Sequence, residues 1–485
     1  MKTWAAALLV LVAGALLRLI TLGDQSLWLD EGLTRALVIQ PFGDMVEGVA
    51  DTENTPPLFY VLTHIVTQVA GTGEAGLRLL SALCGVATIA VAYLAGREID
   101  GDRAGLAAGA LVAVNPFLVW FSQEARSYAL LSLLTAIGLL CFLRAVRVQS
   151  GWALAGWAVA SAAAVVTHYF AIFPVAAEAA WLLWSVRAAP ARRPVLIAVG
   201  SVLAAVTAIA PMAISQEGSG RAESISREDL GPRIAQVPKQ FLVGYDGPLQ
   251  APLTVVSAVL LLVAAVGLWR IRHRREVAAV ALVVIAAVLV PIAAAVAGAD
   301  FLYSRNTLAG LVPVLVLAGV GFAALPWPRL AAAAVAGLVA IGLVTVIGVD
   351  RNPHYQRADW RSLSDAVGRV AGSTLLIVSP GKAEVPLAAY RGGIATAPGS
   401  GTEVTEIILA GVAVNSSAGG SAAPPRPPMP PPPSPGFALV ESELERSYTL
   451  FRYRAPKPTF VRPALLAPTR LNPSYSVLLL RGQEP

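Results

Sequence analysis

Two adjacent carboxylates, Asp30 and Glu31, follow the first long apolar run of the chain, within the sequence Trp28-Leu29-Asp30-Glu31. The chain is 56% hydrophobic and only 14% charged, so charged side chains at a membrane boundary are conspicuous. Because charges near lipid are costly, they usually serve a function, and we expect chemistry on the far side of a bilayer. The pair could instead stabilise the start of the following helix, since acidic residues favour helix N-termini.

Polar side chains of the kinds that bind substrates occur in further segments between the apolar runs. These segments hold carboxylates, aromatic residues and arginines, and the expected topology places them all on one side of the membrane. Such one-sided clustering predicts an active site there. The candidate substrate-binding residues are Pro56, Pro57, Glu124, Arg126, Tyr128, His168, Tyr169, Tyr303 and Arg305.

Most of these candidates also have a structural interpretation. Pro56 and Pro57 could simply start a helix, because proline is favoured in the first turn. Glu124 and Arg126 could form an ion pair at the membrane surface, with no part in chemistry. His168 begins a helix at the interface and could be a polar group that is satisfied within the fold.

Arg305 lies beside Tyr303 at the start of an apolar run, where a guanidinium group could clamp a phosphate. The alternative is an arginine whose stem is buried while its charged end reaches the interface. No cluster of His, Cys and Asp has convincing metal-ligand spacing, so neither a metal site nor a cofactor is expected. The sequence leaves a requirement for a divalent ion open.

The composition indicates a polytopic helical membrane protein, because 485 residues have a mean hydropathy of +0.66. The formal charge of +6 is compatible with nucleic-acid binding. The arginines, however, fall between apolar runs and form no basic stripe, so we expect no nucleic-acid partner. Cys84 and Cys141 lie inside apolar runs and are predicted to be small core residues.

About eleven apolar runs are long enough to cross a bilayer, which takes about 20 residues. The first, Trp4–Leu22, is followed by no cleavage site and is expected to remain as a helix. Arginines concentrate on one side of the resulting topology, which places the N-terminus in the cytoplasm. The segment Pro56–Ala70 is too short to cross, so it should lie on or dip into the membrane within a first external loop, 23–77. The predicted spans are 4–22, 78–96, 104–121, 127–146, 152–167, 169–186, 195–214, 251–270, 277–297, 306–325 and 330–349.

Hydropathy falls after residue 349, so residues 1–349 are predicted to form the membrane domain and residues 350–485 an extracytoplasmic domain. A proline-rich linker at 423–436 interrupts what we interpret as a small α/β module. We expect this module to be a structural lid without chemistry of its own. Its helix and strand patterns lie at Asp359–Leu363, Thr374–Val378, Tyr448–Arg454 and Ser474–Leu480.

An ordered set of short motifs resembles the C-type membrane glycosyltransferases, in the branch that holds protein O-mannosyltransferases and lipid A aminoarabinose transferases. The resemblance covers roughly residues 1–325. Each motif alone is weak, but the set is specific for the family and not for a substrate. The motifs are W-L-D-E-G at 28–32, N-T-P-P-L-F-Y at 54–60, R-L-L-S-A-L-C-G at 78–85, S-Q-E-A-R-S-Y at 122–128, T-H-Y at 167–169 and Y-S-R-N at 303–306.

The resemblance implies a GT-C fold and an inverting transfer of a hexose or pentose from a polyprenyl-phosphate-linked donor to an acceptor hydroxyl. Asp30 matches the family's catalytic aspartate, which takes the acceptor proton, and Glu31 would orient the loop or the acceptor. The departing lipid phosphate needs positive charge, for which Arg126 and Arg305 are the candidates. The family has His or Lys where this chain has Thr55, which either removes a phosphate role there or moves it to an arginine.

The implied acceptor is a lipid, a glycan or a protein, and the implied location is the bilayer of a bacterial inner membrane. A non-enzymatic transporter or flippase of lipid-linked sugars is the alternative, and a wall-polymer ligase would share the donor and the topology. A transporter should carry ionisable residues in mid-span and show repeated halves. The predicted spans are nearly free of charge, apart from Arg18 and Glu178, and no repeat is visible.

Overall fold

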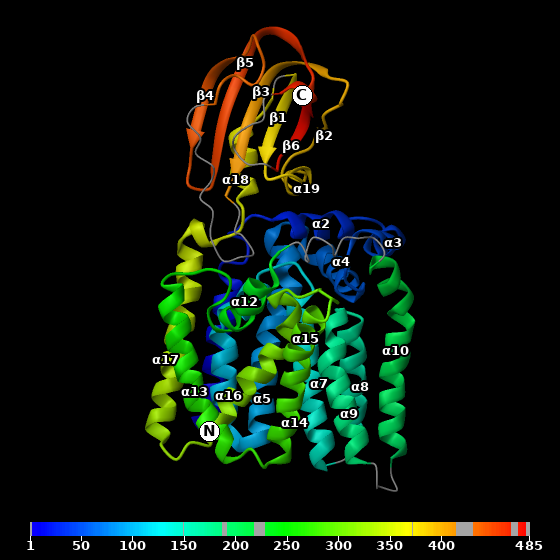
Figure 1. Cartoon of the computed structure of the whole chain (residues 1–485), viewed down its shortest axis with the longest axis vertical. Helices are drawn as coiled ribbons and strands as arrows, with labels where there is room; N and C mark the ends of the chain where they lie inside the picture. Colours follow the sequence, from blue (N-terminus) through cyan, green and yellow to red (C-terminus); the bar gives the residue numbers. More distant parts are fainter. Residues whose placement is uncertain are drawn as a thin grey trace. The chain divides into compact units, whose positions relative to one another are not determined.

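The computed structural model describes residues 2–148, 150–186, 192–217, 228–370, 372–413, 430–466 and 474–481. The chain divides into two compact units. The helical unit consists of Met1–Leu22 and Leu37–Ile347, and the sheet unit consists of Gly23–Ala36 and Gly348–Pro485 (Figure 1). The segment 23–36, which the sequence assigned to the first loop of the membrane domain, thus clusters with the C-terminal residues.

Apolar helices make up the helical unit. Helix α2, Leu29–Val38, runs across the division between the two units, and so does the last turn of the helix that ends at Arg351. The other helical elements are α1 (Lys2–Leu19), α3 (Phe42–Thr52), α4 (Leu58–Ala70), α5 (Glu74–Val114), α6 (Pro116–Ser122), α7 (Tyr128–Val148), α8 (Gly151–Val165), η1 (Tyr169–Ala171), α9 (Ile172–Ser185), α10 (Arg193–Glu217), α12 (Leu230–Val243), α13 (Gln250–Arg270), α14 (Arg275–Val284), η2 (Ile285–Leu289), α15 (Val290–Val296), η3 (Ser304–Gly310), α16 (Leu311–Ala323) and α17 (Pro328–Arg351).

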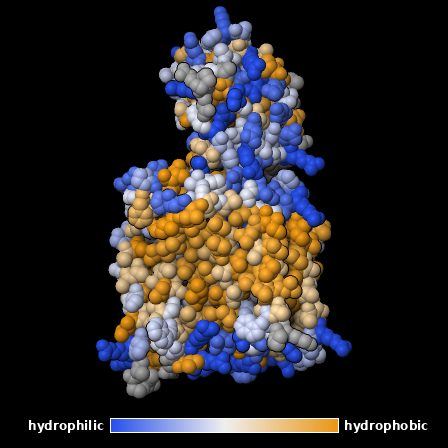
Figure 2. Space-filling view, turned by 180° about the vertical axis from the view of Figure 1, so that it is seen from behind, coloured by the Kyte–Doolittle hydropathy of each residue, from blue (hydrophilic) through white to orange (hydrophobic). Residues whose placement is uncertain are grey.

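Within the described ranges, seven helices are long and apolar enough to cross a membrane, and four shorter apolar helices accompany them. On the face shown in Figure 2, hydrophobic residues form a continuous band across the bundle, bordered by hydrophilic residues at its lower end. The predicted polytopic helical class is therefore confirmed. The 41-residue helix α5 changes direction at Asp100 and Gly101, where φ of Gly101 is 77°, so it provides two consecutive apolar segments.

One predicted span differs from the structure. The sequence suggested an unbroken helix over 104–121, whereas α5 ends at Val114 and α6 begins at Pro116. Proline has no backbone N–H and favours the start of a helix. Asn115 completes the break, because its side chain accepts a hydrogen bond from the Leu118 backbone N–H at 3.1 Å.

The guanidinium group of Arg18 stabilises this break. It donates hydrogen bonds to the carbonyl oxygens of Ala113 at 2.8 Å and Val112 at 3.1 Å, and to the hydroxyl of Ser122 at 3.1 Å. These carbonyls lie at the end of α5, where the helix supplies no further N–H groups to bind them. A buried charge in α1 therefore joins α1, α5 and α6.

Close glycine contacts bring α16 against its neighbours on two sides. A Cβ atom at Gly267 of α13 would lie 1.8 Å from the carbonyl oxygen of Gly321 in α16. A Cβ atom at Gly319 would lie 2.6 Å from the backbone nitrogen of Ala108 in α5. Small residues permit this approach, which supplies packing where lipid provides little hydrophobic driving force between helices.

The sheet unit contains a six-stranded sheet in the order β2-β6-β1-β3-β5-β4, in which β1 and β3 are parallel and the other pairs are antiparallel. An α/β module is therefore confirmed, and the expected helix and strands are present. The linker residues 423–429 lie outside the described residues. The elements are η4 (Pro353–Tyr355), α18 (Trp360–Val367), β1 (Ser373–Ser379), α19 (Glu384–Leu387), β2 (Ile394–Thr396), β3 (Thr402–Val412), β4 (Ala438–Leu444), β5 (Tyr448–Val461), η5 (Pro463–Leu465) and β6 (Ser476–Arg481).

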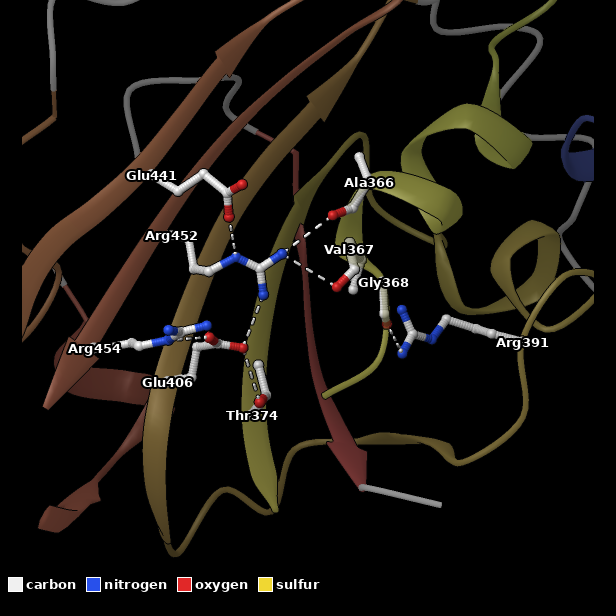
Figure 3. A network of polar contacts seen from close by, with 9 residues as sticks. All are labelled: Ala366, Val367, Gly368, Thr374, Arg391, Glu406, Glu441, Arg452 and Arg454. Carbon is white, nitrogen blue, oxygen red and sulfur yellow. Dashed lines mark hydrogen bonds and ion pairs between the residues drawn. The ribbon is translucent and has the colours of Figure 1, made fainter. Parts of the chain in front are cut away.

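A buried arginine fixes α18 to the sheet. Figure 3 shows Arg452 of β5 between the carboxylates of Glu406 and Glu441, at 3.1 and 2.6 Å. The same guanidinium group donates to the carbonyl oxygens of Ala366 and Val367 at the C-terminal end of α18. Cations stabilise this end of a helix, so the network gives the module a structural centre.

The glycine contact between α13 and α16 generates a first prediction. Gly267→Ala should lower the unfolding free energy by about 1–3 kcal/mol, because its Cβ atom would collide with the Gly321 carbonyl group. Gly200→Ala in α10 is the matched control, since a Cβ atom there meets nothing within 4 Å. Melting temperatures in detergent should fall for the first variant only, and equal melting temperatures would contradict the contact.

Candidate active site

The carboxylates of Asp30 and Glu31 occupy the first turn of α2. Glu31 is fully buried and Asp30 is partly exposed. The hydroxyl of Thr34 donates to the Asp30 carbonyl oxygen at 3.1 Å, one turn along the helix. Both interpretations of the pair are therefore compatible with its position, and Asp30 is the more accessible of the two residues.

The residues before Asp30 are held within the sheet unit. The Ser26 hydroxyl donates to the Ala358 carbonyl oxygen at 2.9 Å and accepts from the Trp360 N–H at 3.0 Å. The Leu27 N–H donates to the hydroxyl of Tyr390 at 2.6 Å. These contacts give the C-terminal module a function in positioning the segment that carries Asp30, which the sequence did not predict.

Arg126 lies in the turn between α6 and α7, where it is buried against the segment that precedes α4. Its Nη1 atom contacts both carboxylate oxygens of Glu53 at 3.0 Å and the hydroxyl of Tyr60 at 3.1 Å. The Tyr60 hydroxyl lies 3.3 Å from that of Thr55. Sequence reasoning missed Glu53 and Tyr60 as partners of this arginine, although both lie within or next to the N-T-P-P-L-F-Y motif.

The Glu124 side chain accepts a hydrogen bond from the indole N–H of Trp120 at 3.0 Å. Tyr128 stacks against His168, with ring centroids 5.5 Å apart. Pro57 is the residue before α4, as the helix-start interpretation predicts for the proline pair. The turn between α6 and α7 thus brings Glu124, Arg126 and Tyr128 to one end of the bundle.

His168 lies in the turn between α8 and η1, and it is neutral. Its Nδ1 atom accepts from the Phe170 N–H at 3.2 Å, which requires that nitrogen to carry no proton. Burial lowers the pKa of the imidazole to about 3, and the positive charges of Arg126 and Arg305 lower it further in the same direction. Two guanidinium groups from different parts of the chain therefore act on one side chain.

Tyr169 connects the same turn to α10. Its hydroxyl donates to the side-chain oxygen of Gln216 at 2.8 Å, and the Gln216 amide donates to the Val49 carbonyl oxygen at 3.2 Å. The Leu58 N–H at the start of α4 donates to the Val166 carbonyl oxygen at 3.2 Å. These bonds hold the proline segment and the His168 turn side by side.

The segment that carries Arg305 is fastened to α12. Arg233 donates to the Asp300 carboxylate at 2.8 Å and to the Leu302 carbonyl oxygen at 2.9 Å. The Tyr303 hydroxyl donates to Glu228 at 3.1 Å, and the Arg305 guanidinium group lies 4.9 Å from the centroid of the Tyr303 ring. The amphipathic helix α12 thereby sets the conformation of the loop before η3.

The structure therefore brings Arg126, Tyr128, His168 and Arg305 into one polar region of the helical unit. Among the described residues, no group of three or more His, Cys, Asp or Glu side chains could hold a metal ion. Guanidinium groups with hydroxyl and imidazole neighbours are suited to an anion, and a phosphate group accepts hydrogen bonds from arginine in a planar geometry.

One family profile resembles part of this chain. Residues 54–214 match the profile of the family described as dolichyl-phosphate-mannose-protein mannosyltransferase. No curated protein matches the chain. The matched residues include Tyr60 and Arg126, which contact each other, and Tyr128 and His168, which stack on each other.

Solved structures share the fold of this chain. ArnT from Cupriavidus metallidurans bound to undecaprenyl phosphate aligns with a TM-score of 0.55 and 13% identity, over 95% of this chain and 99% of that chain. In the apo state, the same protein aligns with a TM-score of 0.50 and 16% identity, over 68% of this chain and 61% of that chain. These matches show the GT-C fold and, together with the family profile, confirm the predicted resemblance and support a glycosyltransferase.

The neutral imidazole predicts a pH dependence of stability. An unfolded histidine titrates near pH 6.5, whereas folded His168 titrates at about 3, so between these values only the unfolded chain binds the proton. Neutral His168 makes its full contribution to the free energy of unfolding above about pH 6.5. Acidification reduces this contribution, by about 2 kcal/mol at pH 5.

His168→Asn should reduce this acid sensitivity, because asparagine retains an acceptor for the Phe170 N–H and does not titrate. The measurement is the difference in melting temperature between pH 7 and pH 5, for the wild type and for the variant in detergent. A variant that loses as much stability as the wild type on acidification would show that His168 does not carry the effect.

Proposed function

We propose that the protein is an inverting glycosyltransferase, which moves a sugar from a polyprenyl-phosphate-linked donor to an acceptor hydroxyl at the extracytoplasmic face of a membrane. The observation that carries the proposal is the action of Arg126 and Arg305 on the single imidazole of His168, within a GT-C fold. Arginines that both act on this region suit a leaving group on which negative charge develops.

The leaving group is a lipid phosphate. ArnT, whose fold this chain shares, binds undecaprenyl phosphate, and the matched family is described by a dolichyl-phosphate-linked sugar. Thr55 stands where the resembled family has a cation, and the Tyr60 hydroxyl links it to Arg126. This contact favours Arg126, in place of a residue of the proline segment, as the group that binds the phosphate.

Asp30 is the proposed general base. Its carboxylate takes the proton from the acceptor hydroxyl while that oxygen forms a bond to the anomeric carbon of the sugar. The bond between the anomeric carbon and the phosphate oxygen breaks, and its electron pair leaves with the lipid phosphate. Attack from the opposite face inverts the configuration at the anomeric carbon. Buried Glu31 orients α2, so that Asp30 meets the acceptor.

In this proposal, the remaining candidates position the side chains that bind the donor. Tyr128 and Tyr303 stack against His168 and Arg305, respectively, and limit the positions of these side chains. Tyr169 holds the turn that carries His168 through Gln216. Glu124 and the prolines Pro56 and Pro57 complete the proposed site, at the turn between α6 and α7 and at the start of α4.

Sidedness, location and acceptor class belong to the same proposal. The excess of arginine in the loops opposite to the site supports a cytoplasmic N-terminus and an extracytoplasmic site, in a bacterial inner membrane. A lipid, a glycan or a protein serves as the acceptor, and a hexose or a pentose is transferred. Arg18 and Glu178, which could have suggested a transport pathway, bind the end of α5 and the Trp157 indole N–H, respectively.

The proposal predicts the outcome of a transfer assay. In nanodiscs, the wild type should move label from one member of a panel of polyprenyl-phosphate sugars, and Asp30→Asn should reduce the rate at least about 100-fold. Asp44→Asn in α3 is the matched control, because Asp44 is an exposed acidic residue in the first turn of a neighbouring helix. Wild-type rates in the Asp30 variant would remove it as the base.

Removal of the positive charge of Arg305 should impair the reaction with the donor more than binding of the acceptor. Arg305→Ala is expected to lower kcat/KM for the donor by about 100-fold, with little change in the KM of the acceptor, because the arginine faces the phosphate. Arg329→Ala, at the start of α17, serves as the control. Equal losses for donor and acceptor would indicate that Arg305 has a structural role.

A further inference from the structure

A hydrophobic groove runs between α1 and α5, and it is lined by residues of these two helices alone. Its volume is about 230 Å³. This is smaller than the roughly 300–1,000 Å³ of sites that enclose drug-sized ligands, and it suits a single hydrocarbon chain. The side chains that line it include Trp4, Leu8, Leu11, Ile89, Tyr93 and Leu106.

The groove follows from the way in which the two helices cross. They approach closely at Gly14, where a Cβ atom would lie 2.3 Å from the Ile89 side chain and 3.0 Å from that of Ala113. Towards the start of α1, the Trp4 and Tyr93 rings are 6.1 Å apart between centroids. Trp4 and Leu8 are 59% and 60% exposed, so one wall of the groove belongs to the surface of the bundle.

One end of the groove is polar. The Arg97 guanidinium group lies 5.1 Å from the centroid of the Trp4 ring and pairs with Asp102 at 2.8 Å. The Tyr93 hydroxyl donates to the same carboxylate at 3.3 Å. The groove is therefore apolar along its length and ends at an arginine, an indole and a phenol. This pattern matches a lipid, which has a hydrocarbon chain and a charged headgroup.

The turn that joins the two halves of α5 has an excess of positive charge. Ion pairs connect it to neighbouring loops, through Glu98 to Arg144 and Arg147, and through Asp100 to Arg274. With Arg97 and Arg103 there are five arginines against the three carboxylates Glu98, Asp100 and Asp102, which leaves a net charge of +2 (5 − 3).

We propose that this groove is a binding site for an anionic glycerophospholipid, with one acyl chain between α1 and α5 and the phosphate at Arg97. The hydrocarbon chain alone gives little selectivity, because lipid tails are about as apolar as the side chains that line the groove. The headgroup therefore determines the occupant, and arginines between helices at a membrane surface favour anionic lipids. This site is separate from the proposed donor site and does not depend on the proposed function.

The experiment uses the full chain in nanodiscs, with phosphatidylglycerol or phosphatidylcholine that carries a photoreactive group on the same acyl chain. Mass spectrometry of peptides should locate the label on Trp4–Leu11 and near Leu106, with about fivefold more from phosphatidylglycerol. Arg97→Gln should abolish this preference, whereas Arg329→Gln should retain it. Equal labelling of the wild type by the two lipids would mean ordinary contact with bulk lipid and would overturn the proposal.

Filling the groove supplies a second test. Ala7→Phe places a ring in the groove and should reduce the labelling several-fold, whereas Ala5→Phe lies on the same helix and does not line the groove. Labelling that stays unchanged in folded Ala7→Phe would overturn the proposal. If that variant fails to fold, the Arg97 and Arg329 variants decide the outcome. Efficient displacement of phosphatidylglycerol by polyprenyl phosphate would assign the groove to the donor instead, and would also overturn it.

Discussion

Arginine side chains that are buried in the helical unit must find acceptors within the protein, and its loops are arranged around this constraint. An uncompensated charge in an apolar interior costs several kcal/mol. Arg18 binds the broken end of α5, Arg126 binds Glu53, and Arg233 binds Asp300. Each of these contacts joins segments that are far apart in the sequence, so the groups that satisfy the charges also fix the loops at the end of the bundle.

The same constraint explains how a polar region can exist beside apolar helices. Arg126 retains its positive charge because Glu53 and Tyr60 satisfy it, and Arg305 is held over the Tyr303 ring on a loop fastened to α12. His168 stays neutral between these charges, so it can exchange hydrogen bonds with an anion without adding a charge that must be compensated. In the proposed function, this arrangement is organised before the donor binds, which is the condition for electrostatic stabilisation of a leaving group.

Much of the fold followed from patterns within single elements. Apolar runs of sufficient length predicted the helices, and Asp359 predicted the start of α18, where its side chain accepts from the Ser362 N–H. The partnership of Arg126 with Glu53 could not be predicted, because it joins residues 73 positions apart and depends on how α4 packs. The attachment of Ser26 to Ala358 was equally hidden, since the Ser26 hydroxyl binds a backbone carbonyl group of the kind that every residue possesses. Pro116 is a helix-breaking residue that the sequence displays. The break was nevertheless not predicted, because the residues on both sides are strongly apolar and suggested one continuous span.

The most direct test of the central claim is an experimental structure of the protein in nanodiscs with a non-transferable polyprenyl-phosphate sugar analogue. The phosphate is predicted to lie within hydrogen-bond distance of both Arg126 and Arg305, with the anomeric carbon open to the Asp30 carboxylate. A phosphate bound away from these two arginines, with the Glu53–Arg126 ion pair undisturbed, would contradict the claim and assign both arginines a purely structural role.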